Sequence, residues 1–156
     1  MLTPLQPKEF FRGVWKGDGE LVPHPLLRWF AARERISFSS ECLWLSDTIW
    51  LVKDRFEFSS GWRIERKMFA ELLAPDRLHV TADDMPGGAD VLLHERGFRF
   101  TPYSVLSAYR CWTFSLRCLD VCTLDDDGCV HDVLRMFWCG FPVATMKLGP
   151  VTITRN

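Results

Sequence analysis

Apolar and polar residues alternate one by one in several segments of this chain, and turn-forming residues separate the segments. The longest segment runs from Trp112 to Thr123, and a second from Val130 to Trp138 follows it after Asp125–Gly128. Successive side chains of a β-strand point to opposite faces, so a period of two predicts strands with one apolar face. Asp-Asp-Asp-Gly is typical of a hairpin turn, because Gly tolerates positive φ. The pattern therefore predicts antiparallel strands joined by hairpins.

About eight to ten such strands fit the chain, with at most one short helix, expected within Pro25 to Arg33, and no parallel crossover. Hairpin-linked strands at regular spacing predict an all-β fold, an antiparallel up-and-down β-barrel. A two-sheet sandwich stays open as the alternative, because periodicity does not show whether a sheet closes on itself. The length of 156 residues predicts one domain over residues 1–156.

The first strand is expected from about Phe10 to Leu21 and carries an unusual glycine pattern. Trp15, Gly17 and Gly19 share one face of this strand, because their spacing is two residues. Glycines on the face that carries a Trp leave room for a bulky neighbour, or let the strand bend at a barrel corner. We therefore expect a close approach or a bend here.

Charge and composition restrict the partners of the protein. Nineteen basic and twenty acidic residues give a net charge of −1, which disfavours nucleic acid, since phosphate binding needs clustered positive charge. No apolar run approaches the roughly 18 residues of a transmembrane segment. The first ten residues lack the basic start and apolar core of a secretory signal, so we expect a cytoplasmic location. A homodimer is left open.

The cysteines and histidines show no metal-ligand motif. The six cysteines form no Cys-x-x-Cys pair, and no His lies at zinc-ligand spacing from a cysteine pair. Free Cys among apolar residues behaves as a small hydrophobe. We therefore expect buried free thiols, no metal and no cofactor, for the cysteines at positions Cys42, Cys111, Cys118, Cys122, Cys129 and Cys139.

Short motifs that follow one another along the chain resemble a known family. They are Phe10-Phe11-Arg12-Gly13, Gly61-Trp62-Arg63-Ile64, Ala89-Asp90-Val91 and Met146-Lys147-Leu148-Gly149. Together they resemble a bacterial lipocalin-like family of unknown function, and Gly13-Val14-Trp15 is similar to the Gly-x-Trp signature of the lipocalin (calycin) superfamily. The resemblance implies a barrel with Trp15 at its floor, and it implies no agreed activity. Many family members look like exported lipoproteins, whereas this chain shows neither signal nor anchoring cysteine.

The glycine-rich opening also resembles that of the nitrobindins. Proteins of that family ligate haem through a His near the C-terminus. The segment after His131 contains no His, so haem is not predicted.

The apolar faces of these strands would line the interior of a closed barrel. Eight to ten strands leave room for one small ligand, lined mainly by aromatic residues with few polar anchors. We therefore predict binding of a small hydrophobic or amphipathic ligand in the barrel interior, with Asp120 or Arg66 as polar anchor. The aromatic residues expected to contact it are Trp50, Trp62, Trp112, Phe114 and Trp138. With nineteen Phe and Trp residues, an interior filled by side chains is the other outcome.

Two carboxylates, Asp120 and Asp132, fall on the same apolar face if the turn before Gly128 closes with a glycine bulge. Burying a carboxylate without a partner is costly, so each would need one, such as Arg66 or a ligand. The simpler alternative, which the sequence favours, places both near the barrel rim in water.

An enzyme that uses the same cavity is the alternative function, and the sequence leaves open whether any catalysis occurs. A cyclase, isomerase or hydrolase acting on a hydrophobic small molecule would need a carboxylate or His with a perturbed pKa. Asp120 and Asp132 are the nearest candidates. No Gly-x-Ser-x-Gly elbow is present, so no catalytic residue is assigned.

Overall fold

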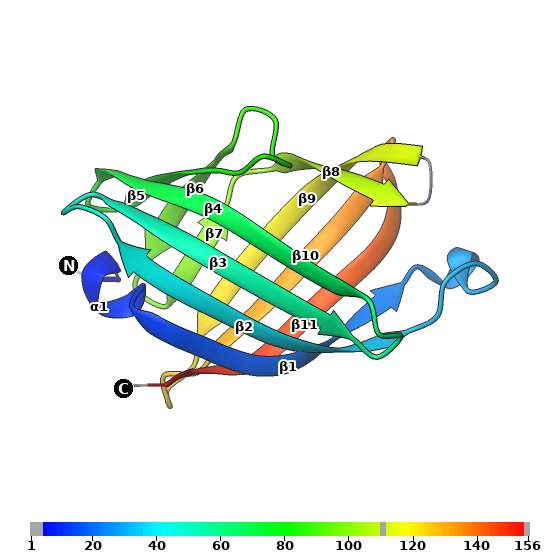
Figure 1. The fold of residues 1–156 in the computed structure, drawn as a ribbon, viewed down its shortest axis with the longest axis horizontal. Helices are drawn as coiled ribbons and strands as arrows, with labels where there is room; N and C mark the ends of the chain where they lie inside the picture. The colour runs from blue at the N-terminus through cyan, green and yellow to red at the C-terminus, as the bar shows by residue number, and fades with distance from the viewer. Residues whose placement is uncertain (1–4, 110–111, 155–156) are drawn as a thin grey trace.

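The computed structural model describes residues 5–109 and 112–154, and it is an antiparallel β-barrel (Figure 1). Each neighbouring pair of strands is joined by an antiparallel hydrogen-bond ladder, as the alternation and the hairpin signals predict. The strands are β1 (Gly13–Pro23), β2 (Glu34–Trp44), β3 (Ile49–Phe58), β4 (Arg63–Ala74), β5 (Arg77–Thr81), β6 (Ala89–His94), β7 (Gly97–Phe100), β8 (Tyr103–Tyr109), β9 (Trp112–Leu124), β10 (Val130–Trp138) and β11 (Phe141–Thr154).

The sheet closes on itself, which confirms the barrel and excludes the sandwich. β1 pairs with β2 and with β11, and β10 pairs with both β11 and β9, so ten strands form a closed ring. β7 and β8 both pair with β9, at its C-terminal and N-terminal halves respectively. The two therefore act as one strand that is interrupted at Thr101-Pro102, where proline cannot donate to the ladder.

The short helix lies elsewhere than expected. It is α1 (Pro7–Phe10), immediately before β1, whereas Pro25–Leu27 forms only a 3₁₀ turn, which corrects the helix predicted within Pro25 to Arg33. Trp29 and Phe30 in this segment are 80% and 85% exposed, so a helix there has no core to pack against. No helix among the described residues is long and apolar enough to cross a membrane.

The helix α1 lies at one end of the barrel (Figure 1), and aromatic side chains pack together there. The Phe10 ring packs 4.8 Å from Trp15, and the Phe11 ring stacks 5.3 Å from Trp50. Trp44 donates its indole N–H to the Phe11 carbonyl at 2.6 Å. These contacts join α1 to the first three strands, and Trp15 lies buried beneath them.

One stretch of the barrel wall is closed by a loop instead of a ladder. The first half of β4, residues 63–68, pairs with β3 alone, and β8 pairs with β9 alone among the described residues. The β5–β6 loop, residues 82–88, bridges these two free edges through Asp84. The Asp84 carbonyl accepts from the Leu106 N–H of β8 at 2.8 Å, and its carboxylate accepts from Arg66 Nε of β4 at 3.1 Å.

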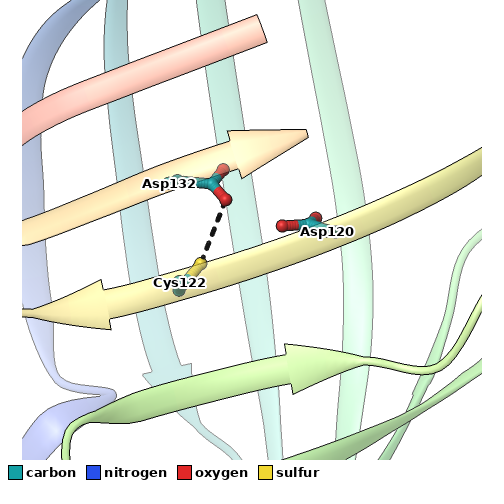
Figure 2. A group of neighbouring side chains, drawn as sticks. All are labelled: Asp120, Cys122 and Asp132. Atoms are coloured by element: carbon teal, nitrogen blue, oxygen red, sulfur yellow. Dashed lines mark hydrogen bonds between the residues drawn. The ribbon is translucent and has the colours of Figure 1, made fainter. Parts of the chain in front are cut away.

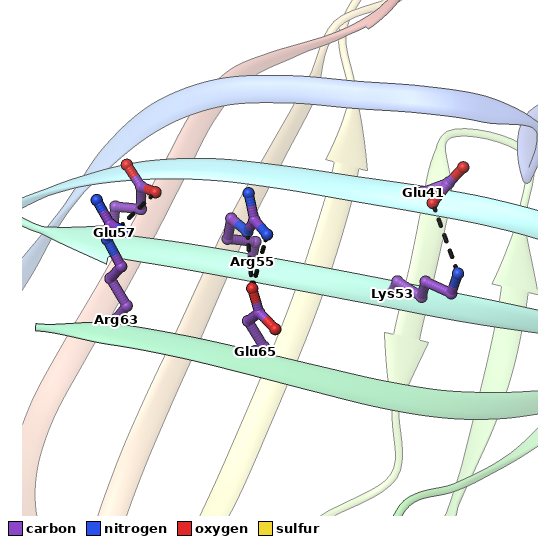
Figure 3. Close-up of polar contacts among 6 residues, drawn as sticks. All are labelled: Glu41, Lys53, Arg55, Glu57, Arg63 and Glu65. Atoms are coloured by element: carbon purple, nitrogen blue, oxygen red, sulfur yellow. Dashed lines mark hydrogen bonds and ion pairs between the residues drawn. The ribbon is translucent and has the colours of Figure 1, made fainter.

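The outer face of β2, β3 and β4 carries cross-strand ion pairs (Figure 3). Each pair joins residues that lie directly opposite each other in the ladder, and the distances are 4.0 Å for Lys53–Glu41, 2.7 Å for Arg55–Glu65 and 3.5 Å for Arg63–Glu57. Exposed pairs of this kind contribute at most about 1 kcal/mol each. The pairs show how these three strands are oriented: the odd-numbered charged residues face water, and the even-numbered residues face the interior.

The glycines of the opening strand let β11 approach closely. The ladder between β1 and β11 shifts register between Gly17 and Gly19, as in a β-bulge. A Cβ atom at Gly19 would lie 2.1 Å from the Lys147 carbonyl oxygen, and one at Gly17 would lie 2.7 Å from the Pro150 carbonyl oxygen. The bulky neighbour that these glycines accommodate is thus the backbone of β11.

We expect Gly19→Ala to lower the free energy of unfolding by on the order of 1–3 kcal/mol, because the added methyl group overlaps backbone that cannot rotate away. Urea denaturation followed by circular dichroism would measure the loss. Asp18→Ala is the control, since Asp18 is exposed and should change stability by less than about 0.5 kcal/mol. Equal midpoints for the two variants would contradict the packing argument.

Candidate functional site

The barrel encloses a cavity of about 170 Å³. Its lining is mostly aromatic and aliphatic, and includes side chains such as Trp15, Phe38, Trp50, Phe56, Phe98 and Phe100. A cavity of about 150 Å³ in an engineered protein holds benzene, so this one has room for a compact ring or a short chain. The interior is therefore not completely filled by its own side chains.

Part of the cavity lining is polar, because four strands on facing walls of the barrel place charged residues on their inner faces. In the ladders, Asp54 of β3 lies opposite Arg66 of β4 and opposite Ser40 of β2. All three line the cavity, together with Asp120 of β9 and Asp132 of β10. The interior phase of each strand explains this placement, since each residue is an even number of positions from a buried apolar neighbour.

Asp120, Cys122 and Asp132 form the densest part of the polar lining (Figure 2). One ligand atom from each, two carboxylate oxygens and the Cys122 sulfur, lie within 4.8 Å of one another. Cys122 Sγ donates to Asp132 Oδ1 at 3.3 Å, and the Tyr103 hydroxyl donates to Asp120 Oδ2 at 3.2 Å. The turn that aligns the two strands contains Gly128 at φ +79°, which fits the turn predicted before β10.

Burial changes the ionisation of the carboxyl groups. It raises the pKa of Asp120 well above its usual range, and the nearby charge of Asp132 raises it further. Burial likewise raises the pKa of Asp132. It also raises the pKa of Asp54 to about 6, against the lowering effects of the Ser40 hydroxyl and the Arg66 guanidinium. Two like charges this close in a buried site are costly, so Asp120 and Asp132 favour holding a proton between them.

Four polar atoms of the cavity lining are buried and have no hydrogen-bond partner among the described residues. They are two acceptors, Asp54 Oδ1 and Asp120 Oδ1, and two donors, Trp50 Nε1 and Arg66 Nη2. A buried polar atom without a partner costs about 1–3 kcal/mol, so such atoms are rare in folded proteins. A bound molecule with its own donors and acceptors would satisfy them.

The structure brings together half of the residues that the sequence analysis selected. Trp50, Arg66, Asp120 and Asp132 all line the cavity. Asp120 is only 9% exposed and Asp132 is partly buried, so the alternative that places both carboxylates in water at the barrel rim is wrong.

Three other aromatic residues of that prediction, Trp62, Phe114 and Trp138, do not line the cavity. Trp62 and Trp138 are 49% and 47% exposed. Trp62 stacks on Phe58, and Phe114 meets Trp138 edge to face at 6.0 Å. These residues lie where strands begin or end, at the end of the barrel opposite α1. The alternation of side chains shows which face of a strand a residue is on, but not its position along the barrel axis. The side chain of Trp112 lies outside the described residues.

Asp54 is a site residue that the sequence analysis missed. A signal was present, because Asp54 lies between Val52 and Phe56 with a spacing of two residues on each side. Its neighbours Lys53 and Arg55 point outward, and a charged run of three residues conceals the inward one. A carboxylate on an apolar stripe is the signal that also marks Asp120.

The five cysteines among the described residues are free thiols with unequal exposure. Cys42, Cys118 and Cys122 are buried, as expected, whereas Cys139 is exposed in the β10–β11 turn, and Cys111 lies outside the described residues. Burial raises the pKa of Cys42 and of Cys118 to about 12. The group Asp120, Cys122 and Asp132 could hold a metal ion only after losing the thiol proton, and burial and the two carboxylates raise the pKa of Cys122 well above normal.

We predict that the protein becomes less stable as pH rises from about 4 to about 6. Asp54 keeps its proton in the folded protein up to about pH 6, whereas an unfolded Asp releases it near pH 3.9. The folded state thus binds more protons within this window, so the free energy of unfolding falls with rising pH, by roughly 2–3 kcal/mol at most. Urea titrations at pH 4.5, 5.5, 6.5 and 7.5 would measure the slope.

Asp54→Asn is the matched variant for this measurement. It should reduce the slope and unfold at higher urea than the wild type at pH 7.5, because the amide has no charge to bury. Asp120 and Asp132 shift in the same direction, so part of the slope remains. An unchanged slope in Asp54→Asn would show that this carboxylate is solvated in the folded protein.

Comparison with known proteins identifies the fold. No family model matches the chain, and no curated protein matches its sequence. Among solved structures, the S-type phycobiliprotein lyase CPES from Guillardia theta aligns with a TM-score of 0.59 at 9% sequence identity, over 97% of this chain and 94% of that chain. A de novo designed fluorescence-activating β-barrel aligns with a TM-score of 0.40 at 11% identity, over 94% of this chain and 98% of the designed one. What this chain shares with the lyase is the fold, which here is a closed antiparallel β-barrel.

Proposed function

We propose that the protein binds one small amphipathic molecule inside the barrel. The observation that carries the proposal is a cavity of about 170 Å³ whose lining holds four buried polar atoms without partners among the described residues. An apolar cavity with a few convergent polar groups is the usual form of a small-molecule site. In a core filled by the protein's own side chains, unpaired carboxylate oxygens and an unpaired guanidinium nitrogen would lower stability with no compensating gain.

Each part of the lining has a role in this proposal. The aromatic side chains Phe38, Phe56 and Phe98 surround the apolar body of the ligand. Asp120 or Arg66 anchors its polar end, since each keeps one buried atom free for a hydrogen bond, an acceptor on Asp120 and a donor on Arg66. The Trp50 indole N–H supplies a further donor on the side of α1.

The ligand would enter away from α1. That helix and its aromatic neighbours close one end of the barrel. Between β4 and β8 no ladder closes the wall, and only the loop of residues 82–88 bridges the two strands there. Asp84 links this loop to Arg66, so opening the loop would also release the guanidinium that faces the cavity. Trp62 and Trp138, both half exposed at the end opposite α1, would contact an entering apolar molecule first.

We also infer kinship with the bacterial lipocalin-like family, supported by its motifs and by the barrel fold. A cytoplasmic location and a homodimer stay predictions, which fractionation of the native host and analytical ultracentrifugation would test.

Binding can be tested with indole, a neutral ring that has one donor and fits a cavity of this size. We expect indole to raise the melting temperature of the wild type and to give a measurable heat of binding. Val52→Phe should fill the cavity and weaken indole at least tenfold, and Asp120→Asn should weaken it severalfold by altering the anchor. Asp18→Asn is the control, because Asp18 is exposed on β1 and does not line the cavity.

Native mass spectrometry of the purified protein would add the identity of any molecule that it retains. If indole binds all four proteins equally, the cavity is not the binding site and the proposal fails. If only Val52→Phe loses binding, the cavity is the site and the anchor role of Asp120 is wrong.

A second candidate function, catalysis on the bound molecule, is favoured by one observation. Asp120 is buried, the partly buried Asp132 lies beside it, and the pKa of both is raised, which are properties of a carboxyl pair that donates and accepts protons. If the protein is an isomerase or hydrolase, Asp132→Asn should retain the co-purified molecule but lose its conversion, as measured by mass spectrometry over time. Recovery of the same unchanged molecule from wild type and variant would leave binding as the function.

A further inference from the structure

The charges that line the cavity do not balance. Three carboxyl groups, Asp54, Asp120 and Asp132, face it together with one guanidinium, that of Arg66. Arg66 already pairs through Nε with a fourth carboxylate, Asp84, which lies outside the cavity lining. No second Lys or Arg lines the cavity in the described part of the chain, so the site has an excess of negative charge even when Asp120 and Asp132 hold one proton between them.

Neutral hydrogen-bond donors pair with only some of the carboxylate oxygens. The Tyr103 hydroxyl serves Asp120 Oδ2, and the Cys122 thiol serves Asp132 Oδ1. Asp120 Oδ1 and Asp54 Oδ1 are buried and have no hydrogen-bond partner within residues 5–109 and 112–154. The whole Asp120 residue is only 9% exposed, so water does not replace the missing partner. Unpaired carboxylate oxygens in a low-dielectric site create a strong demand for a positive group with hydrogen-bond donors.

We propose that the ligand carries an organic cation, an ammonium or amidinium group on a compact apolar body, and that Asp120, Asp132 and Asp54 bind this cationic end. The inference rests on the proposed function and specifies its ligand. An ammonium group has three donors and an amidinium four, which is enough for the two free carboxylate oxygens, Asp120 Oδ1 and Asp54 Oδ1. The rings of Phe38 and Phe56, 5.0 Å apart in the same lining, present further faces that favour a cation.

A divalent metal ion is a poorer occupant of the cluster. Cys122 would have to lose a proton that it currently donates to Asp132, in surroundings that already carry negative charge. A metal ion would also leave the apolar part of the cavity without contents. The carboxylates and the aromatic lining together fit an amphipathic cation better.

Three probes of nearly equal shape test the inference: benzylamine, benzyl alcohol and benzoate. In calorimetric titrations at pH 7.5 with EDTA, we expect benzylamine to bind the wild type at least tenfold more tightly than benzyl alcohol, and benzoate to show no measurable binding. Asp120→Asn and Asp132→Asn should each reduce the preference for benzylamine to threefold or less, because each removes a carboxylate and so weakens benzylamine much more than benzyl alcohol. Asp18→Asn should behave as the wild type, and circular dichroism would verify the fold of every variant.

The outcomes separate this inference from the proposed function. Equal binding of benzylamine and benzyl alcohol, or tighter binding of benzoate, overturns the cationic ligand and leaves small-molecule binding intact. Binding of none of the three probes, or binding that Val52→Phe does not reduce, overturns both. Zn²⁺ is added in a separate experiment without EDTA. If Zn²⁺ stabilises the wild type but not Asp120→Asn, and benzylamine shows no preference, the cluster is a metal site and the inference is wrong.

Discussion

The energetic cost of burying charge determines how the interior of this barrel is organised. Three inward carboxyl groups would be very unfavourable in an apolar lumen if each stood alone. The Arg66 guanidinium partly offsets this cost, because its positive charge lowers the pKa of both Asp54 and Asp120. Arg66 is itself held in place by Asp84, so an inner electrostatic centre depends on a surface loop.

This arrangement links the ionisation of the site to the closure of the wall. The Asp84 backbone carbonyl holds β8 through Leu106, while its carboxylate holds Arg66 on β4. One residue thus joins two strand edges that share no ladder in the described part of the chain, and it also positions the guanidinium among the inner carboxyl groups. A change in the loop would alter both the shape of the entrance and the charge inside.

Much of the fold was predictable because alternation is a local property. The phase of each strand can be read from neighbours two residues apart, and it placed Trp50, Arg66 and Asp120 on the inner face. Closure into a barrel was a reasonable extension, since each strand has one apolar face that must be covered. The glycines of the first strand also pointed correctly to a close approach, although their partner, β11, lies at the other end of the chain.

What could not be predicted depends on position along the barrel axis and on contacts between distant segments. Trp62 and Trp138 have the inner phase but lie at strand ends, where the lumen opens to water. Asp54 lies between two charged residues that point outward, so its inward position was not recognised. The loop that contains Asp84 fills a gap between β4 and β8, and this gap depends on strand lengths that the sequence pattern does not fix. The helix was misplaced because Phe10 and Phe11 find a core to pack against, whereas Trp29 and Phe30 do not.

The two free strand edges have a consequence for the behaviour of the protein at high concentration. An unpaired edge presents N–H and C=O groups to any extended segment, so it is a starting point for edge-to-edge aggregation. β4 carries the charged residues Arg63, Glu65 and Lys67 on its exposed side along this stretch, and covering them with a second strand would remove them from water at a cost. These side chains would therefore keep a second molecule from extending the sheet where the barrel wall leaves room for it.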